Sequence, residues 1–151
     1  MRIDRAMMIV VLAGALTGAS CDENLATLAG PSPNLQPTLS SIEREVFNAT
    51  DSSGRQSCTS CHTDAGGRVA PVGMVLLTGR SYASLVNVAS RNKAGAVRVI
   101  PGDPENSYLV HKLEGRSGMV GVRMPRGDGP FLTDGQMLII KRWIALGAPN
   151  D

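Results

Sequence analysis

The chain has 151 residues, of which 42% are hydrophobic and 19% charged, and its formal net charge is +2. This length fits one small globular domain with short additional segments, and it excludes two full-sized domains. The charged residues are scattered without a basic cluster, which excludes the electrostatic footprint of a nucleic-acid-binding protein.

Residues 1–21 have the pattern of a secretory signal peptide. Two arginines provide a basic start, and the apolar run over 6–16 is about eleven residues long, which is short for a membrane span. The run ends near Cys21 in a context that resembles a bacterial lipoprotein box, although Gly18 stands where the box usually has leucine. We therefore expect an exported, periplasmic protein, either membrane-anchored through lipidated Cys21 or released by ordinary signal cleavage.

The segment 22–38 separates this signal from the remainder of the chain. It is rich in Pro, Ser, Asn, Thr and Gly and has no sustained hydrophobic period, which is typical of a flexible tether. A tether behind a lipid anchor would let a folded domain reach partners at a membrane surface. We predict that the domain itself covers 39–151.

Two short helices are expected in the first half of this domain. A helix over 41–49 is indicated by Ser40 and Glu43, which have the spacing of a capping box. A second helix over 81–89 is indicated by Ser81 as its N-cap.

A third helix is predicted to begin at Pro104 and to end near Leu113. Asp103 suits the N-cap position, and proline suits the first turn because its missing N–H has no partner there in any helix. Just before it, residues 96–100 have the composition of a brief extended piece.

The last helix has the strongest local signals. Thr133 and Gln136 form a capping-box pattern at its start, and Gly147 and Pro149 mark its end. The predicted apolar arc consists of Met137, Ile140, Trp143, Ile144 and Leu146. Because no pair of strand patterns flanks these helices, the predicted fold class is all-α.

The sequence Cys58–Thr59–Ser60–Cys61–His62 is the attachment pattern for covalent haem. Two thiols about one helical turn apart can each bond a vinyl group at the same porphyrin edge. The adjacent imidazole then lies beneath the iron, so His62 is the candidate proximal ligand. Export agrees with this assignment, because haem attachment of this kind takes place outside the cytoplasm.

Three other uses of the same residues remain as alternatives. A structural zinc site needs about four Cys or His ligands, and outside the motif the chain has only Cys21 and His111. A thioredoxin-like redox pair belongs next to a βαβ pattern, which is absent from the sequence. The third alternative is a plain structural disulfide.

A sixth iron ligand has to come from downstream in the chain. Met124 lies in a turn-prone segment, and the following Pro125 restricts its backbone. Met119 and Met74 are alternative thioether ligands. His111 would be a ligand only in a bis-histidine arrangement, and its place in the middle of a predicted helix favours a structural role.

The order of these features resembles the small His/Met c-type cytochromes: a helix, Cys-x-x-Cys-His, a Met-Pro loop and a final amphipathic helix with a tryptophan. In detail, the segments 99–109, 124–125 and 143–148 are similar to cytochrome c domains of planctomycetes and related bacteria. The resemblance covers about 39–148. It implies a cytochrome c fold, with few helices and long loops around one covalently attached haem c, and it implies Met124 as the distal ligand.

With His62 and Met124 both bound, the iron would be six-coordinate and closed to substrates, which favours electron transfer over catalysis. The sequence therefore predicts an electron carrier of the cell envelope, not an enzyme, with redox proteins as its partners. One alternative is a haem enzyme or gas-sensing module with an open sixth position. Another is an electron-outlet module of a larger oxidoreductase.

Overall fold

The computed structural model describes residues 30–151, so the predicted signal peptide, Cys21 and residues 22–29 of the predicted tether lie outside the described residues. Within 30–151 the structure contains helices and three isolated β-bridges but no strand, so this part of the chain is all-α, as predicted. None of its helices has the length and hydrophobicity that crossing a bilayer requires.

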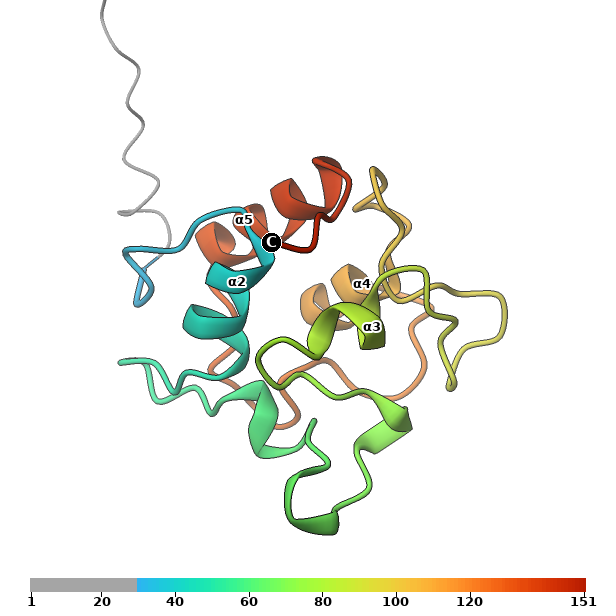
Figure 1. The fold of residues 1–151 in the computed structure, drawn as a ribbon, viewed down its shortest axis with the longest axis horizontal. Helices are drawn as coiled ribbons and strands as arrows, with labels where there is room; N and C mark the ends of the chain where they lie inside the picture. Colours follow the sequence, from blue (N-terminus) through green and yellow to red (C-terminus); the bar gives the residue numbers. More distant parts are fainter. Residues whose placement is uncertain (1–29) are drawn as a thin grey trace, which may run out of the picture.

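The α-helices are α2 (Leu39–Ile42), α3 (Ser81–Leu85), α4 (Tyr108–Glu114) and α5 (Asp134–Ala145). A π-helical turn, η1 (Glu43–Phe47), continues α2, and the 3₁₀ turns are η2 (Cys58–Ser60), η3 (Ala65–Gly67) and η4 (Pro71–Gly73). In Figure 1, α2, α4 and α5 gather in the upper part of the view, while the loops and short turns between α2 and α3 fill the lower part. Helices therefore form one side of the molecule and irregular chain forms the other.

The core lies where α2, α4 and α5 meet. Its fully buried apolar residues are Ile42, Val46, Leu85, Val99, Val110, Ile140, Trp143, Ile144 and Ala148. The two ends of the domain meet beside this core, because the Leu39 N–H donates to Asp151 Oδ1 at 2.6 Å (Figure 1). The indole N–H of Trp143 donates to the Pro149 carbonyl at 3.0 Å, so the last residues are tied to α5.

The first helix begins earlier than predicted, and the capping box at Ser40 is wrong. The N-cap is Thr38, whose hydroxyl accepts from the Ser41 N–H, and Ser40 lies inside α2. Glu43 makes no capping bond because its carboxylate has buried partners elsewhere: it accepts from the Gly79 N–H at 2.9 Å and from the Ser81 hydroxyl at 2.5 Å. A tertiary contact between α2–η1 and α3 has replaced the local one.

The second helix ends at Leu85, four residues before the predicted end at 89. Ser81 is not its cap but its first residue, with the hydroxyl bonded to Glu43. The chain leaves the helix because it pairs with the predicted extended piece: Val86 bridges Val99, and Ala89 bridges Val97.

The third helix begins at Tyr108 with Ser107 as its N-cap, so the predicted start at Asp103 and Pro104 is wrong. Asp103 instead pairs with Ile100 in an isolated bridge and accepts the Asn106 N–H at 3.1 Å in a turn. Because the backbone of Asp103 pairs with Ile100, it is not free to begin a helix at this residue.

The last helix confirms the predicted capping box. The Thr133 hydroxyl accepts the Gln136 N–H, and the Gln136 side chain accepts the Thr133 N–H. Four members of the predicted apolar arc are buried, whereas Leu146 is 63% exposed because it lies past the end of the helix. Ile139, which is absent from the predicted arc, is buried.

Residues 30–38, assigned to the tether by the sequence analysis, contact the domain. Leu35 is buried, and the Ser32 hydroxyl accepts from Gln136 Nε2 at 2.9 Å while it donates to the Glu45 carbonyl at 3.3 Å. The packed part of the chain therefore begins before Leu39.

Candidate functional site

The two predicted cysteines and the predicted imidazole lie on one tight turn. The Cys61 and His62 N–H groups both donate to the Cys58 carbonyl, at 3.2 and 2.9 Å. Both cysteines are free thiols, Cys58 partly buried and Cys61 exposed. The 3₁₀ turn and the two residues that follow it carry the three reactive side chains within five consecutive residues.

The end of η1 holds this turn in place. The last carbonyls of a helix have no partner within the helix and need one elsewhere. Here the Val46 carbonyl accepts from Arg55 Nη1 at 3.1 Å and from the Cys58 thiol at 3.8 Å, and the Phe47 carbonyl accepts from the Thr59 hydroxyl at 3.4 Å. The α2–η1 helix therefore positions the cysteine motif through the backbone carbonyls of its last residues.

A cavity of about 450 Å³ lies beside the motif. Cys58, Cys61, His62 and Met124 all line it, so the structure brings together the four residues that the sequence predicted for a single site. Most of the remaining wall is apolar, from Phe47, Pro71, Val72, Met74, Leu76, Leu109, Leu113, Pro125 and Pro130. The volume and the apolar wall are those of a site for an organic ligand, which typically occupies roughly 300–1,000 Å³.

The charges on the cavity wall have one sign. Arg55, Arg98, Lys112 and Arg126 line it, and among the described residues no Asp or Glu does. Arg98 is buried, and its guanidinium donates to the carbonyls of Ser84 and Val72 at 2.6 Å each, not to a carboxylate. Burial lowers its pKa, and the positive charge of Arg91 adds to this effect. Buried positive charge without a carboxylate partner favours a ligand that carries negative charge.

Two buried polar atoms in residues 30–151 have no hydrogen-bond partner, Arg55 Nη2 and His62 Nδ1, and both belong to residues that line this cavity. Buried polar groups without partners are rare in folded proteins, and they concentrate where a ligand or water is bound. The cavity wall thus carries the polar atoms that remain to be satisfied.

The environment of His62 favours its neutral form. Burial lowers the pKa of the imidazole, and the charge of Arg98 lowers it further. The nearby backbone of Met74 opposes this shift, although it is not aligned for a hydrogen bond to the ring. A neutral imidazole has a free nitrogen lone pair, which a metal ion requires. Burial likewise raises the pKa of the Cys58 thiol, although Arg55 opposes this.

The residues considered for the sixth iron ligand lie in different places in the structure. Met119 and His111 do not line the cavity, and the ring of His111 instead bonds the Glu105 carbonyl at 2.7 Å. Met74 lines it as Met124 does, and the backbone of Met74 lies near His62. Met124 reaches the cavity from a different segment, which is bonded to α4.

The polar residues of the cavity wall were not predicted from the sequence. Arg55, Arg98 and Lys112 appear in the sequence as ordinary surface cations, and no local pattern distinguishes them from the other basic residues. Only the folding of distant segments against the motif brings them to the same cavity.

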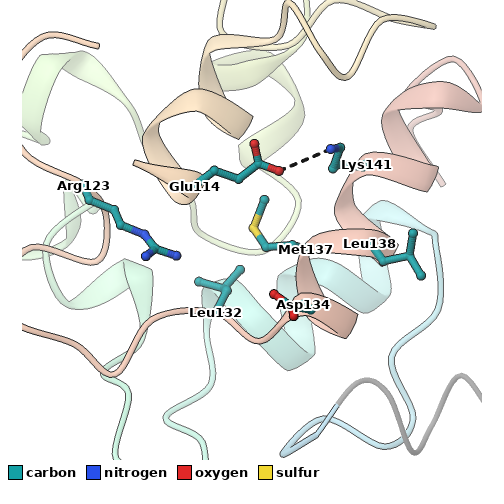
Figure 2. Close-up of a pocket in the computed structure, with 7 residues that line it drawn as sticks. All are labelled: Glu114, Arg123, Leu132, Asp134, Met137, Leu138 and Lys141. Carbon is teal, nitrogen blue, oxygen red and sulfur yellow. Dashed lines mark hydrogen bonds and ion pairs between the residues drawn. The ribbon is translucent and has the colours of Figure 1, made fainter. Parts of the chain in front are cut away.

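A second, shallower cavity of about 350 Å³ lies between the end of α4 and the first turns of α5 (Figure 2). Its wall combines both signs of charge, since Glu114 and Asp134 lie there with Arg123 and Lys141. The dashed line in Figure 2 joins Glu114 to Lys141, whose charged atoms are 3.3 Å apart. None of the predicted site residues lines this cavity, so it is separate from the candidate site.

The fold and the site together define a helical domain with a cationic, mostly apolar cavity next to two cysteines and a histidine. Comparison with protein family models, curated proteins and solved structures finds no match to this chain. In residues 30–151 no three His, Cys, Asp or Glu side chains gather as a metal ion would require, and such a group is what the zinc alternative needs.

Proposed function

We propose that this chain is an electron-transfer protein of the c-type cytochrome class, with one haem c bonded to Cys58 and Cys61. One observation carries the proposal: both thiols, the imidazole of His62 and the thioether of Met124 line one cavity of about 450 Å³. Met124 is far from the cysteine motif in the sequence, so local spacing alone does not explain why its thioether lines the same cavity.

The residues of the cavity fit a haem group. When bound, haem supplies a one-electron redox centre at its iron. The two thiols would bond its vinyl groups, and His62 and Met124 would be the axial ligands. The apolar wall would exclude water, and the basic residues Arg98 and Arg126 would offset the charge of the two propionates.

The role as a carrier follows from the two axial ligands. A methionine ligand raises the reduction potential relative to a second histidine, and a six-coordinate iron has no open position for a substrate. The protein would hold the same ligands in both oxidation states, so that little reorganisation accompanies each electron. A haem enzyme, a gas-sensing module or the outlet of a larger oxidoreductase would use the same attachment, and the first two would leave the sixth position open.

The proposal includes the cytochrome c fold and a location in the cell envelope. The all-α structure and the contact of α2 with the C-terminal residues agree with such a fold. Haem attachment of this type requires export, and redox proteins of the envelope would be the partners. Attachment to a membrane would depend on lipidation of Cys21.

Co-expression with a cytochrome maturation system, followed by a haem stain of a denaturing gel, tests the covalent attachment directly. We expect the wild-type chain to stain and the double variant Cys58→Ser/Cys61→Ser to lose the stain. Cys21→Ser is the matched control, since it removes a cysteine outside the motif and should stain normally. An unstained wild-type chain would exclude the proposal.

The axial ligand is tested on the purified holoprotein with Met124→Ala. This variant should keep the haem stain, lose the methionine-to-iron charge-transfer band of the ferric protein, and bind carbon monoxide in the ferrous state. A wild-type ferrous protein that itself binds carbon monoxide readily at neutral pH would favour the enzyme or sensor alternatives instead.

A further inference from the structure

The segment that brings Met124 to the cavity has little apolar anchoring of its own. Val120 is 46% exposed and Val122 is 50% exposed, so both valines leave much of their surface in solvent. Glycines at 118 and 121 have positive φ and add no side chain to pack. Met124 packs against the core at the end of the segment and Arg116 forms ion pairs at its start, so the residues between them are held largely by hydrogen bonds.

Most of those hydrogen bonds go to α4, and one comes from outside it: the Lys93 ammonium donates to the Gly118 carbonyl at 2.8 Å. The Tyr108 hydroxyl accepts the Val120 N–H at 2.9 Å, and Arg123 Nε donates to the Leu113 carbonyl at 2.7 Å. Lys112 bonds the segment at three points. Its ammonium donates to the Val120 carbonyl at 2.9 Å and to the Val122 carbonyl, and its own carbonyl accepts the Met124 N–H at 2.8 Å.

We propose that Lys112 is the positioning residue for the sixth iron ligand, because its ammonium and its carbonyl together hold the 116–124 segment with Met124 at the cavity. This inference rests on the proposed function and deepens it. Lys112 does not act on the iron itself, although its side chain lines the same cavity.

The use of the Lys112 charge distinguishes it from neighbouring basic residues. Lys141 pairs with Glu105 and Glu114, and Arg116 pairs with the same two carboxylates. The Lys112 ammonium instead donates hydrogen bonds to two backbone carbonyls. Hydrogen bonds from an ionised donor are stronger than those from a neutral one, so one ammonium can hold two points of an otherwise weakly anchored segment.

The test compares Lys112→Met with Lys141→Met in the full-length holoprotein. Methionine keeps much of the length and apolar volume of lysine but has no donor, and Lys141→Met is the control for the loss of a partly exposed lysine beside α4. We expect Lys112→Met to keep the haem stain and to lose or weaken the methionine-to-iron charge-transfer band. Binding of carbon monoxide to the ferrous variant should become about tenfold faster, which corresponds to about 1.4 kcal/mol in the opening of the segment.

Lys141→Met should behave as the wild type in both measurements. A Lys112→Met protein with the wild-type band and the wild-type rate of carbon monoxide binding would overturn the inference and leave the proposed function intact. An unstained wild-type protein would instead overturn the proposed function. If Lys112→Met does not accumulate as a haem protein, Lys112→Gln takes its place in the same assay, with the same two decisive outcomes.

Discussion

The ion pair between Asp51 and Arg55 is nearly inaccessible to solvent. Arg55 Nε lies 2.9 Å from Asp51 Oδ2, and the two side chains are 0% and 3% exposed, with Arg55 the more buried. The same guanidinium donates to the Val46 carbonyl, next to the Cys58 thiol. A buried pair of this kind does little for net stability, but the removal of one partner leaves the other as an uncompensated buried charge.

Arg55→Met should lower the free energy of unfolding by about 3 kcal/mol, because Asp51 would keep its burial and lose its cation. Urea unfolding at neutral pH measures this change. Arg80→Met is the matched control: it breaks an ion pair with Asp64 whose side chains are 54% and 37% exposed, and should change stability little. Equal losses in both variants would show that burial of the Asp51 pair is not the cause.

The pH dependence of the same variant follows from the pKa of Asp51. Burial raises this pKa, but hydrogen bonds from Ser53 and the charge of Arg55 outweigh burial and hold it below its ordinary value of 3.8. The wild type therefore has this stabilisation above that value and loses it as the pH falls through the lowered pKa. Below both values the carboxyl is neutral in folded and unfolded chains, so the difference between wild type and Arg55→Met should shrink in strong acid.

At the level of elements, α5 is the helix whose local signals and tertiary role agree. Its capping box satisfies the N–H groups of its first turn, and its inner face carries Trp143 and Ile140 into the core. By contrast, α2 lasts one turn before it becomes η1, and the carbonyls at the end of η1 serve the cysteine turn. The α5 helix is stabilised by its own capping box, whereas the last carbonyls of η1 accept hydrogen bonds from the cysteine turn and from Arg55.

Thr133→Ala should lower the free energy of unfolding by about 1 kcal/mol, because alanine has no oxygen to accept the Gln136 N–H. Thermal or urea unfolding followed by circular dichroism measures the change. Thr133→Ser keeps the oxygen and should retain most of the stability. A serine variant as unstable as the alanine variant would indicate that the methyl group of Thr133, not the cap, is responsible.

At the scale of the whole molecule, the cavity beside the cysteine motif is a large feature of a small domain. Its wall is mostly apolar, so a ligand that fills it would remove apolar surface from water, at roughly 25 cal/mol per Å². The total stability of a small domain is roughly 5–15 kcal/mol. A ligand that fills the cavity would therefore be part of the core.

Cys58→Ser/Cys61→Ser, which cannot form thioether bonds, should consequently unfold at a much lower temperature and with less cooperativity than the holoprotein. Circular dichroism during heating measures both quantities, and Cys21→Ser is again the control. If the double variant unfolded as cooperatively as the holoprotein and at the same temperature, the cavity would not be a missing part of the core.

The features that the sequence alone determined are those that depend on residues within one helical turn of each other. The cysteine and histidine spacing led to one tight turn with three reactive side chains, and the Thr133 and Gln136 pair led to the start of α5. Both hold because the bonds that form these structures join near neighbours. The all-α class followed from the same local signals.

The tertiary structure alone decided the conformation of residues for which a distant hydrogen-bond partner competed with a local one. Glu43, predicted to cap the first helix, instead accepts a hydrogen bond from Ser81 of α3. Asp103, predicted to cap the third helix, forms a bridge with Ile100, and α4 begins at Tyr108. Arg98 and Lys112 line the cavity because distant segments fold against the cysteine turn. Such choices depend on burial and on contacts between distant residues, and neither is present in any short stretch of the chain.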